Sequence, residues 1–157
     1  MKFSAQEEFG LRCMMALAKE GEDGFLTIPA IARAEGLTQS HVAKLLAVLR
    51  KSGFVNSHRG QQGGYTLGRP AREVKVSALL ATLGGRLCTD HFCDRFSGLN
   101  IECVHTTDCS LLPLWVRIQN AVDDALDRTT LADLVDPRAG VNVRLYDDPS
   151  MRVPAEV

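Results

Sequence analysis

Four of the five cysteines, Cys88, Cys93, Cys103 and Cys109, fall within a stretch of 22 residues, and Cys13 stands alone near the N-terminus. An odd number of cysteines, in a chain that does not look exported, argues against a framework of structural disulfides. Thiolates bind iron–sulfur clusters and zinc, and they are also the nucleophiles of redox switches. The cysteine pattern therefore favours metal or redox chemistry.

The segment that carries these cysteines, residues 86–109, has no regular apolar period. We interpret it as a loop that is ordered by something other than apolar packing. His91, His105 and Asp108 are further side chains of the loop that can bind a metal. Four readings stay open at this point: an iron–sulfur cluster, a zinc site, a regulatory disulfide between Cys103 and Cys109, or cysteines without a special role. Cys13 lies on an apolar helix face and is expected in the core.

The elements before this loop predict a helix-turn-helix. Residues 4–20 have helical apolar spacing, and Ser4 with Glu7 has the spacing of a capping box. A short helix is predicted from Thr27 to Gly36, and a second one over 38–53 that buries its own apolar face. Two short helices joined by a few residues that include glycine are typical of this motif.

A β-hairpin is predicted next, with strands at 54–58 and 64–67 and glycines between them. A hairpin directly after a helix-turn-helix makes a winged helix, in which the second helix enters the DNA major groove. The predicted DNA-binding residues are Thr38, Gln39, Ser40, His41 and Lys44 on that helix, Lys51 at its end, and Arg59, Gly60, Gln61 and Gln62 in the wing.

Charge supports this prediction. Residues 28–75 contain eight Lys and Arg against two Glu, a balance of +6, and because the whole chain carries −1 the remainder sums to −7. A basic segment within an acidic chain indicates a local surface for a polyanion. Arg59, at the predicted tip of the wing, is placed to enter the minor groove.

After the wing, a helix is predicted over 72–83, a long helix over 110–126 and a short one over 129–135, followed by a loosely ordered tail. Leu114, Ile118, Val122 and either Ala125 or Leu126 form an apolar stripe on the long helix, widened by Leu111 and Trp115. So apolar a stripe indicates packing against the domain itself or a second copy of the helix.

Several classes of protein are not indicated. We find no nucleophile–base pattern, phosphate-binding loop or dinucleotide fingerprint, so an enzyme with a small-molecule substrate is not expected. No apolar run is long enough to span a membrane, and Glu7 and Glu8 interrupt the N-terminus where a signal peptide would be apolar. A cytoplasmic protein without membrane contact is expected.

Three stretches resemble one known family. LRKSGFVNSHRGQQGGYTLGRP is similar to the wing region of the bacterial Rrf-type iron–sulfur regulators that include IscR, NsrR and RirA. MKFSAQEEFGLRCMMALA resembles their first helix, and DCSLLPLWVRIQNAVDDALDRTTLADL resembles their dimerisation helix and the short helix after it. The resemblance implies a homodimer that binds a palindromic operator in double-stranded DNA.

The resemblance also implies a cluster site. Cys103 and Cys109 match the last two cysteine ligands of the family in spacing and position, and Cys93 is assigned as the first. Glu8 matches a carboxylate ligand that comes from the first helix of the partner subunit in some members. Arg12 stands where one type of member has a histidine ligand. The alternates are Cys88 and His105, and the cluster is of the 2Fe-2S or the 4Fe-4S type.

The predicted fold is mainly α with a small β-hairpin. Its parts are a winged helix-turn-helix domain over 1–84, a cysteine-rich cluster-binding loop over 85–109, a dimerisation helix with its following short helix over 110–135, and a flexible tail over 136–157. The predicted function is a homodimeric transcriptional regulator, for instance a repressor, whose operator affinity follows an iron–sulfur cluster that senses iron, redox state or nitric oxide. The alternative is a cluster-free regulator that senses redox state through a thiol and disulfide pair.

Overall fold

A computed structural model of the chain describes residues 3–21, 24–58, 60, 63–86, 88, 92–100, 102–105 and 108–136. Arg59, Gln61, Gln62 and His91, and the predicted tail from residue 137 onwards, lie outside these residues. The fold is mostly helical with one two-stranded antiparallel sheet, as predicted. Among the described residues, no helix combines the length and the apolar character needed to cross a membrane.

The first helix, α1 (Ala5–Lys19), begins at the predicted capping box. The backbone N–H of Ser4 donates to the Glu7 carboxylate at 2.7 Å, and the Ser4 hydroxyl accepts from the Glu7 N–H at 3.2 Å. The buried face of α1 includes Cys13, Met14 and Leu17. Gly10 lets α4 (Val76–Leu83) approach α1 closely, because an added Cβ would lie 2.5 Å from the Leu83 side chain.

The helix-turn-helix consists of α2 (Ile28–Glu35) and α3 (Gln39–Lys51). Gly36 ends α2 in the left-handed conformation with φ of 65°, which glycine adopts without a Cβ clash. The apolar face of α3 is buried through Val42, Leu45, Leu46 and Leu49. The boundaries and the buried face agree with the sequence prediction.

The hairpin is formed by β1 (Val55–His58) and β2 (Gly64–Leu67), paired from Val55 with Leu67 to His58 with Gly64. Leu26 adds a bridge to Tyr65, with N···O distances of 2.8 and 3.0 Å in the two directions. This bridge attaches the start of α2 to the hairpin.

The segment 72–83, predicted as one helix, is divided. A 3₁₀ turn, η1 (Ala71–Glu73), precedes α4 (Val76–Leu83), and Val74 between them is extended and fully buried. The Val74 carbonyl accepts from the Leu131 N–H at 2.8 Å, and Lys75 pairs with Thr130. This long-range pairing with the start of α6 (Leu131–Val135) replaces the first turn of the expected helix.

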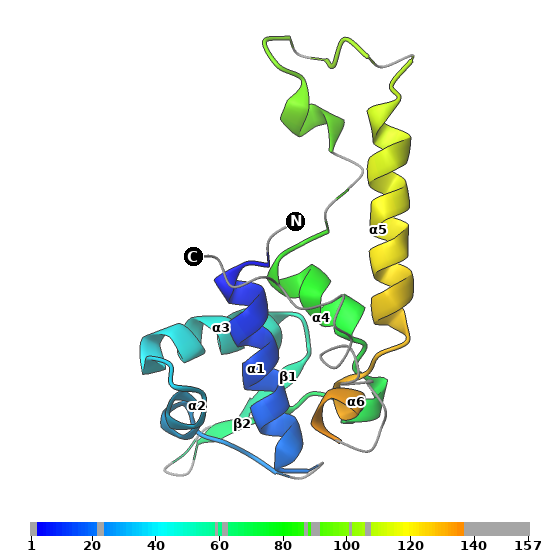
Figure 1. Cartoon of the computed structure of the whole chain (residues 1–157). Coiled ribbons are helices and arrows are strands. Elements are labelled where there is room, and N and C mark those ends of the chain that lie inside the picture. Colours follow the sequence, from blue (N-terminus) through cyan, green and yellow to red (C-terminus); the bar gives the residue numbers. More distant parts are fainter. Residues whose placement is uncertain are drawn as a thin grey trace, which may run out of the picture.

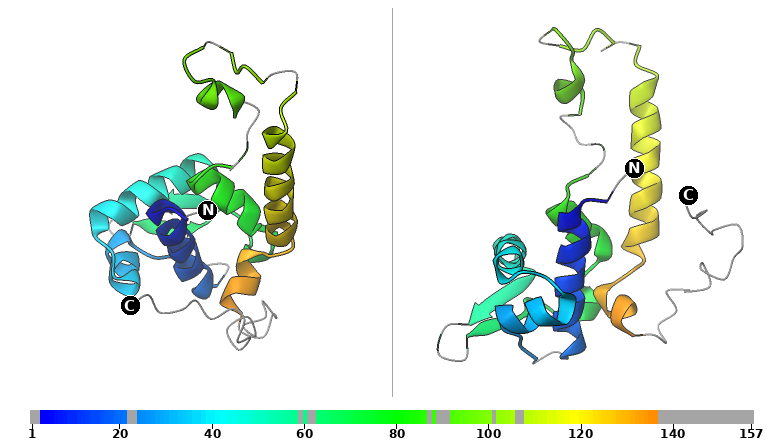
Figure 2. Two further views of the ribbon diagram at one scale, coloured as in Figure 1. Left: turned by 45° about the horizontal axis from the view of Figure 1, so that its top comes forward. Right: turned by 60° about the vertical axis from the view of Figure 1, so that its left-hand side comes forward.

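The remaining elements are a short 3₁₀ turn, η2 (Cys93–Phe96), and α5 (Leu111–Asp127). Figure 1 shows α5 rising along one side of the molecule, with its N-terminal end beyond the winged-helix core and beside the loop that contains η2. Both views of Figure 2 show the same arrangement. The C-terminal part of α5 packs on α4, whereas Leu111, Leu114, Trp115 and Val116 are exposed. Packing against the domain itself, one of the two predicted possibilities, is thus observed for the C-terminal part of the helix.

Candidate functional site

The start of α3 presents the polar residues predicted to bind DNA. Thr38 is its N-cap, and the Thr38 hydroxyl accepts from the His41 N–H at 3.2 Å. Gln39, Ser40 and Lys44 are exposed. Because the opposite face of α3 is buried in the core, this polar face of the helix is held toward solvent.

His41 differs from its neighbours, since it is half-buried and its ring meets Phe9 of α1 edge-on, with 5.3 Å between the ring centres. The Arg12 guanidinium lies over the same phenyl ring, and its Nε is 2.9 Å from Glu35 at the end of α2. The first helix therefore braces the helix-turn-helix on one side. No pattern in the sequence indicates this aromatic contact between distant residues.

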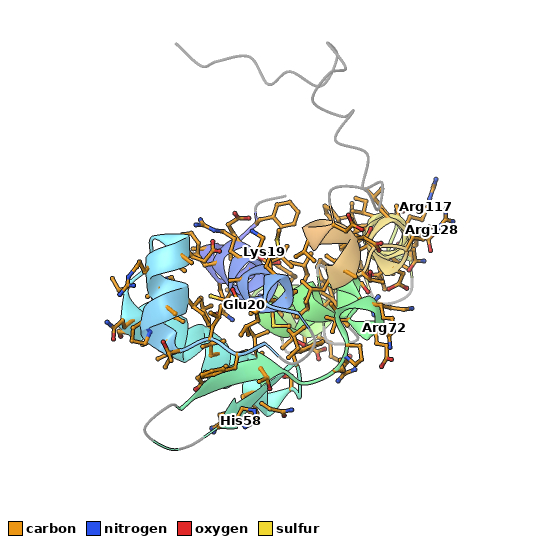
Figure 3. All side chains as sticks on the ribbon, turned by 90° about the horizontal axis from the view of Figure 1, so that it is seen from below. Lys19, Glu20, His58, Arg72, Arg117 and Arg128 are labelled. Carbon is orange, nitrogen blue, oxygen red and sulfur yellow. The ribbon has the colours of Figure 1, made fainter. Side chains whose placement is uncertain are left out.

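The hairpin carries the second part of the predicted DNA surface. His58 Nε2 lies 3.1 Å from the Thr66 hydroxyl, and Gly60 has φ of 128°, a conformation that favours glycine. Lys51 is exposed at the end of α3. Seen from below in Figure 3, His58 lies on the hairpin at one edge of the molecule, away from Arg117 and Arg128 on α5.

Arg50 is a residue of this surface that the sequence analysis did not assign to DNA. Its guanidinium lies 3.4 Å from the Ser57 hydroxyl, so it connects the recognition helix to the hairpin. Arg50 also lines a pocket of about 380 Å³ together with Thr27, His58 and Tyr65. Arg50 was not predicted to bind DNA because its position already has another explanation: a basic residue in the last turn of a helix stabilises the helix dipole.

Three of the predicted cluster ligands meet at a second place. Cys93, Cys103 and Cys109 line one pocket of about 340 Å³ at the N-terminal end of α5, and His105 lines it as well. The other walls are apolar and aromatic, from Phe92, Phe96, Leu111, Leu112 and Trp115. The structure thus brings together three thiols that the sequence separates by up to 16 positions.

The electrostatics of the pocket reflect this proximity. Partial burial, and after it the negative charges of Cys103, Cys109, Asp94 and Cys88, raise the pKa of the Cys93 thiol above its usual value. A bound cation would remove this repulsion, because it stabilises all the thiolates together. Cys109 has a further partner, since its sulfur accepts from the Leu112 N–H at 3.3 Å. Such N–H groups at a helix N-terminus stabilise negative charge on the sulfur.

Cys88 lies next to this site rather than in it. It lines a neighbouring pocket of about 550 Å³, and Cys93 lines both pockets. Its backbone N–H donates to the Gln119 side chain at 3.2 Å. Cys13 is fully buried in the core, and burial raises its pKa to about 11, so this thiol stays protonated, as expected for a core cysteine.

Glu8 is exposed on α1, whereas Glu7 is engaged in the capping box. Glu8 does not line the cysteine pocket of its own chain. In the described part of the chain, no three Cys, His, Asp or Glu side chains converge closely enough to hold a metal ion. The types of donor fit an iron–sulfur cluster, because Cys is its usual ligand. Their arrangement in one chain is a shared pocket, not a closed coordination shell.

His105 and Asp108, the other potential ligands of the loop, lie beside each other at 3.8 Å between Nδ1 and Oδ1, and both are exposed. His105 faces the cysteine pocket and keeps its place as an alternate ligand. Arg12 stands at the position where one type of family member has a histidine ligand. Its guanidinium donates hydrogen bonds to both the side-chain carboxylate and the backbone carbonyl of Glu35.

The chain matches known transcriptional regulators over most of its length. It is 31% identical over 134 residues to the HTH-type transcriptional regulator CymR of Bacillus subtilis, which covers 85% of this chain and 89% of the relative. It is 26% identical over 152 residues to the regulator IscR of Pectobacterium atrosepticum, covering 97% and 90% of the two chains.

Solved structures of a CymR and of an IscR are also similar to the chain. CymR, described as the global cysteine regulator of B. subtilis, has a TM-score of 0.68 at 30% identity and covers 86% of this chain and 96% of its own. IscR of T. potens has a TM-score of 0.66 at 28% identity and covers 99% and 94%. Both the winged-helix fold and the absence of enzyme activity predicted from the sequence agree with these relatives.

A family model for Rrf2, described as an iron-dependent transcriptional regulator, matches residues 3–137. This match includes the helix-turn-helix, the hairpin, the cysteine loop and α5. The chain therefore belongs to the Rrf2 family of DNA-binding transcriptional regulators.

Proposed function

We propose that the chain is a homodimeric regulator whose operator affinity is controlled by an iron–sulfur cluster. Cys93, Cys103 and Cys109 would hold the cluster, with Glu8 of the partner subunit as the remaining ligand. The observation that carries this proposal is the shared pocket of the three thiols at the N-terminal end of α5. When bound, the cluster supplies a link among these ligands that oxidants, nitric oxide or loss of iron can break.

The DNA-binding half of the proposal rests on the exposed residues of α3 and on the wing. Gln39, Ser40 and Lys44 would face base edges or phosphates in the major groove, and Lys51 and Arg50 the phosphates beside it. Arg59, with Gly60, Gln61 and Gln62, would follow the adjacent minor groove. Thr38 acts first as the cap of α3, and His41 first as a packing partner of Phe9.

The dimer would form along α5. Its exposed apolar residues Leu111, Leu114, Trp115 and Val116 all belong to the N-terminal half of the helix, and Figure 1 shows this end of α5 extending past the core. Exposed large apolar side chains that gather on one part of a helix favour association with a second copy. Two copies related by a two-fold axis would present two recognition helices to a palindromic operator of double-stranded DNA.

Cluster binding and DNA binding would be coupled through α5 and α1. The cysteine pocket uses Leu111, Leu112 and Trp115 of the proposed dimer helix as its wall. Ordering the loop therefore orders the end of α5. Glu8 of the partner subunit lies one residue before Phe9, which touches His41 of that subunit's recognition helix. A ligand at Glu8 would thus act on the element that sets the position of α3.

Isolation without oxygen tests the cluster directly. Iron and acid-labile sulfide should be present in similar amounts in a coloured protein, and operator affinity should differ between the loaded protein and the protein after chelation. A colourless protein that contains zinc, or equal operator affinity with and without the cluster, would reject the proposal.

A mixed dimer tests the position of Glu8. One chain carries Glu8→Ala and the other Cys103→Ala. If Glu8 acts across the dimer, one site lacks both ligands and the other is intact, so half of the wild-type cluster remains with an unchanged spectrum. If Glu8 acts within its own chain, both sites are damaged and no wild-type spectrum remains.

The alternative is a cluster-free regulator with a redox-active disulfide. The closeness of three thiols favours it as the second candidate, since Cys103 and Cys109, the predicted disulfide pair, line the same pocket as Cys93 and both raise the pKa of the Cys93 thiol. One structural relative, CymR of Staphylococcus aureus with a TM-score of 0.66, was solved in an oxidised form. A protein without iron whose operator affinity changes reversibly with peroxide and a dithiol reductant would select this alternative.

A further inference from the structure

Gln119 is the only buried polar residue among the described residues of the long helix, with 6% of its surface exposed. Its side-chain oxygen accepts from the backbone N–H of Cys88 at 3.2 Å, and its side-chain nitrogen donates to Asp123 at 2.8 Å. The other oxygen of Asp123 binds the Arg86 guanidinium. This chain of contacts, which we term the α5 clamp, joins residues 86 and 88 to the helix.

The helix therefore holds both ends of the cysteine loop. At its N-terminal end, the Leu112 N–H binds the sulfur of Cys109. Seven residues further along, which is about 10 Å of helix, Gln119 holds the backbone of Cys88. The hydrogen bond from Gln119 is made to the main chain of Cys88 and not to its sulfur. The clamp therefore positions the Cys88 thiol but leaves it free to bind a metal.

Position matters here because Cys88 is a competing ligand. Cys88 and Cys93 line the same 550 Å³ pocket, so the two thiols face a common space. Of these two cysteines, only Cys93 also lines the pocket of Cys103 and Cys109. Because both residues line this pocket, a shift of the main chain at Cys88 can bring a chemically identical thiol toward the place of Cys93.

We propose that Gln119 is a positioning residue that selects Cys93 over Cys88 as the first cluster ligand, by anchoring the backbone of Cys88 to α5. This inference rests on the proposed cluster. Without the amide of Gln119, the Cys88 N–H and the Asp123 carboxylate lose their shared partner, and a buried donor without a partner seeks another one. The segment then moves, and Cys88 competes for the iron.

The variant Gln119→Leu removes the hydrogen bonds to Cys88 and Asp123 at similar side-chain volume. Asn120→Leu is the matched control, because Asn120 lines the same pocket from the next position of the helix and has no hydrogen bond to Cys88. Each is combined with Cys93→Ser. Asp123→Ala, which removes the far anchor of the clamp, serves as the second variant if Gln119→Leu does not fold.

The first readout is iron and sulfide content after anaerobic isolation. Cys93→Ser alone should lower both at least about fivefold, because a thiolate ligand is lost. Adding Gln119→Leu should restore at least about half of the wild-type content, since Cys88 replaces the missing ligand. Adding Asn120→Leu should restore nothing. A general loss of stability cannot produce this gain.

The second readout is protection of each thiol from iodoacetamide in the loaded protein. Trypsin releases both thiols in one peptide, residues 87–95, and fragment ions then assign the label to Cys88 or Cys93. In the wild type, Cys88 should be labelled and Cys93 protected. In Gln119→Leu, label should appear on Cys93 as well, and part of Cys88 should become protected.

The outcomes separate the two proposals. A wild type without iron and sulfide rejects the cluster and the ligand choice together. A loaded wild type in which Cys88 is protected, or in which Gln119→Leu neither restores Cys93→Ser nor shifts the label, overturns only the role of Gln119.

Discussion

The winged-helix half of the chain buries its own apolar side chains, whereas the N-terminal part of α5 leaves them at the surface. Of the buried apolar residues that the structure describes, all but Leu131 lie between positions 13 and 83. α5 has 17 residues, and its one buried residue is the polar Gln119. Over the same helix Leu111 is 61% exposed and Leu114 47% exposed.

The winged-helix half forms its packing and hydrogen bonds within one copy of the chain, whereas the cysteine loop and the N-terminal part of α5 do so only in part. The helix-turn-helix and hairpin have a core, caps and strand pairing within one copy. The cysteine loop and the end of α5 instead offer unpaired thiols and apolar surface. Both features suit partners outside the chain, a cluster for the thiols and a second subunit for the helix.

The largest expected effect is the loss of iron and sulfide when a cysteine of the loop is replaced. Cys93→Ser, Cys103→Ser and Cys109→Ser should each lower the iron and sulfide content at least about fivefold when the clamp is intact, because each removes a thiolate. Cys88→Ser should lower it less. The measurement is iron and sulfide per chain after isolation without oxygen.

Cys13→Ala is the control from the other half. Cys13 is fully buried, so its loss should reduce folding stability by roughly 1 kcal/mol through a small cavity. It should leave the cluster content unchanged. Equal losses from Cys13→Ala and Cys103→Ala would mean that the cysteine effects report folding and not ligation.

The next effect concerns the exposed part of α5. Leu114→Asp should weaken self-association by roughly a hundredfold, as expected for a central apolar contact of an interface. Ile118, in the middle of the apolar stripe predicted from the sequence, is a less suitable site for this substitution. It is half-buried within its own chain, so a charge there would also disturb internal packing. Sedimentation velocity measures the result, with Arg128→Ala as the control at the other end of the helix. An unchanged dimer would place the interface elsewhere.

The third effect lies in the wing. Arg59→Ala should reduce operator affinity by about 1–3 kcal/mol and lower the salt dependence by about one ion. Ser40→Ala should instead change base preference at a single position of each half-site. Fluorescence anisotropy at several salt concentrations measures both, and Arg128→Ala should be silent. If neither substitution alters affinity or base preference, the DNA surface is assigned wrongly.

The sequence predicted the winged-helix half well because its signals are local. The capping box of Ser4 and Glu7, and the short helix that starts at Thr27 and ends at Gly36, each depend on a few neighbouring residues. Apolar spacing then assigned the buried face of α3. Family resemblance added the ligand set, which spacing alone could not choose among alternatives.

The features that the sequence did not predict are contacts between distant segments. Val74 became extended because it pairs with Leu131, 57 positions further along. Gln119 looked like an ordinary polar residue of a helix, yet it is buried against Cys88, 31 positions before it. His41 met Phe9 in the same way. Periodicity carries no information about such partners, because it describes one element at a time.

The smallest effect compares the first turns of two helices. The Thr38 hydroxyl accepts a backbone N–H in α3, whereas the N-cap of α5, Ser110, makes no such bond with its side chain. At α5 the acceptor is the sulfur of Cys109 instead. Thr38→Ala should therefore lower the free energy of unfolding by about 1 kcal/mol, and Thr38→Ser should largely preserve it.

Ser110→Ala should change the free energy of unfolding by no more than a few tenths of a kcal/mol, as is usual for an exposed residue without a cap bond. Urea unfolding of the four proteins, the wild type included, measures these differences. Thr38→Ala should also weaken operator binding by up to the same free energy, because the cap fixes the first turn of the recognition helix. Equal losses from Thr38→Ala and Ser110→Ala would contradict the idea that the winged helix is capped by its own side chains while α5 relies on a ligand cysteine.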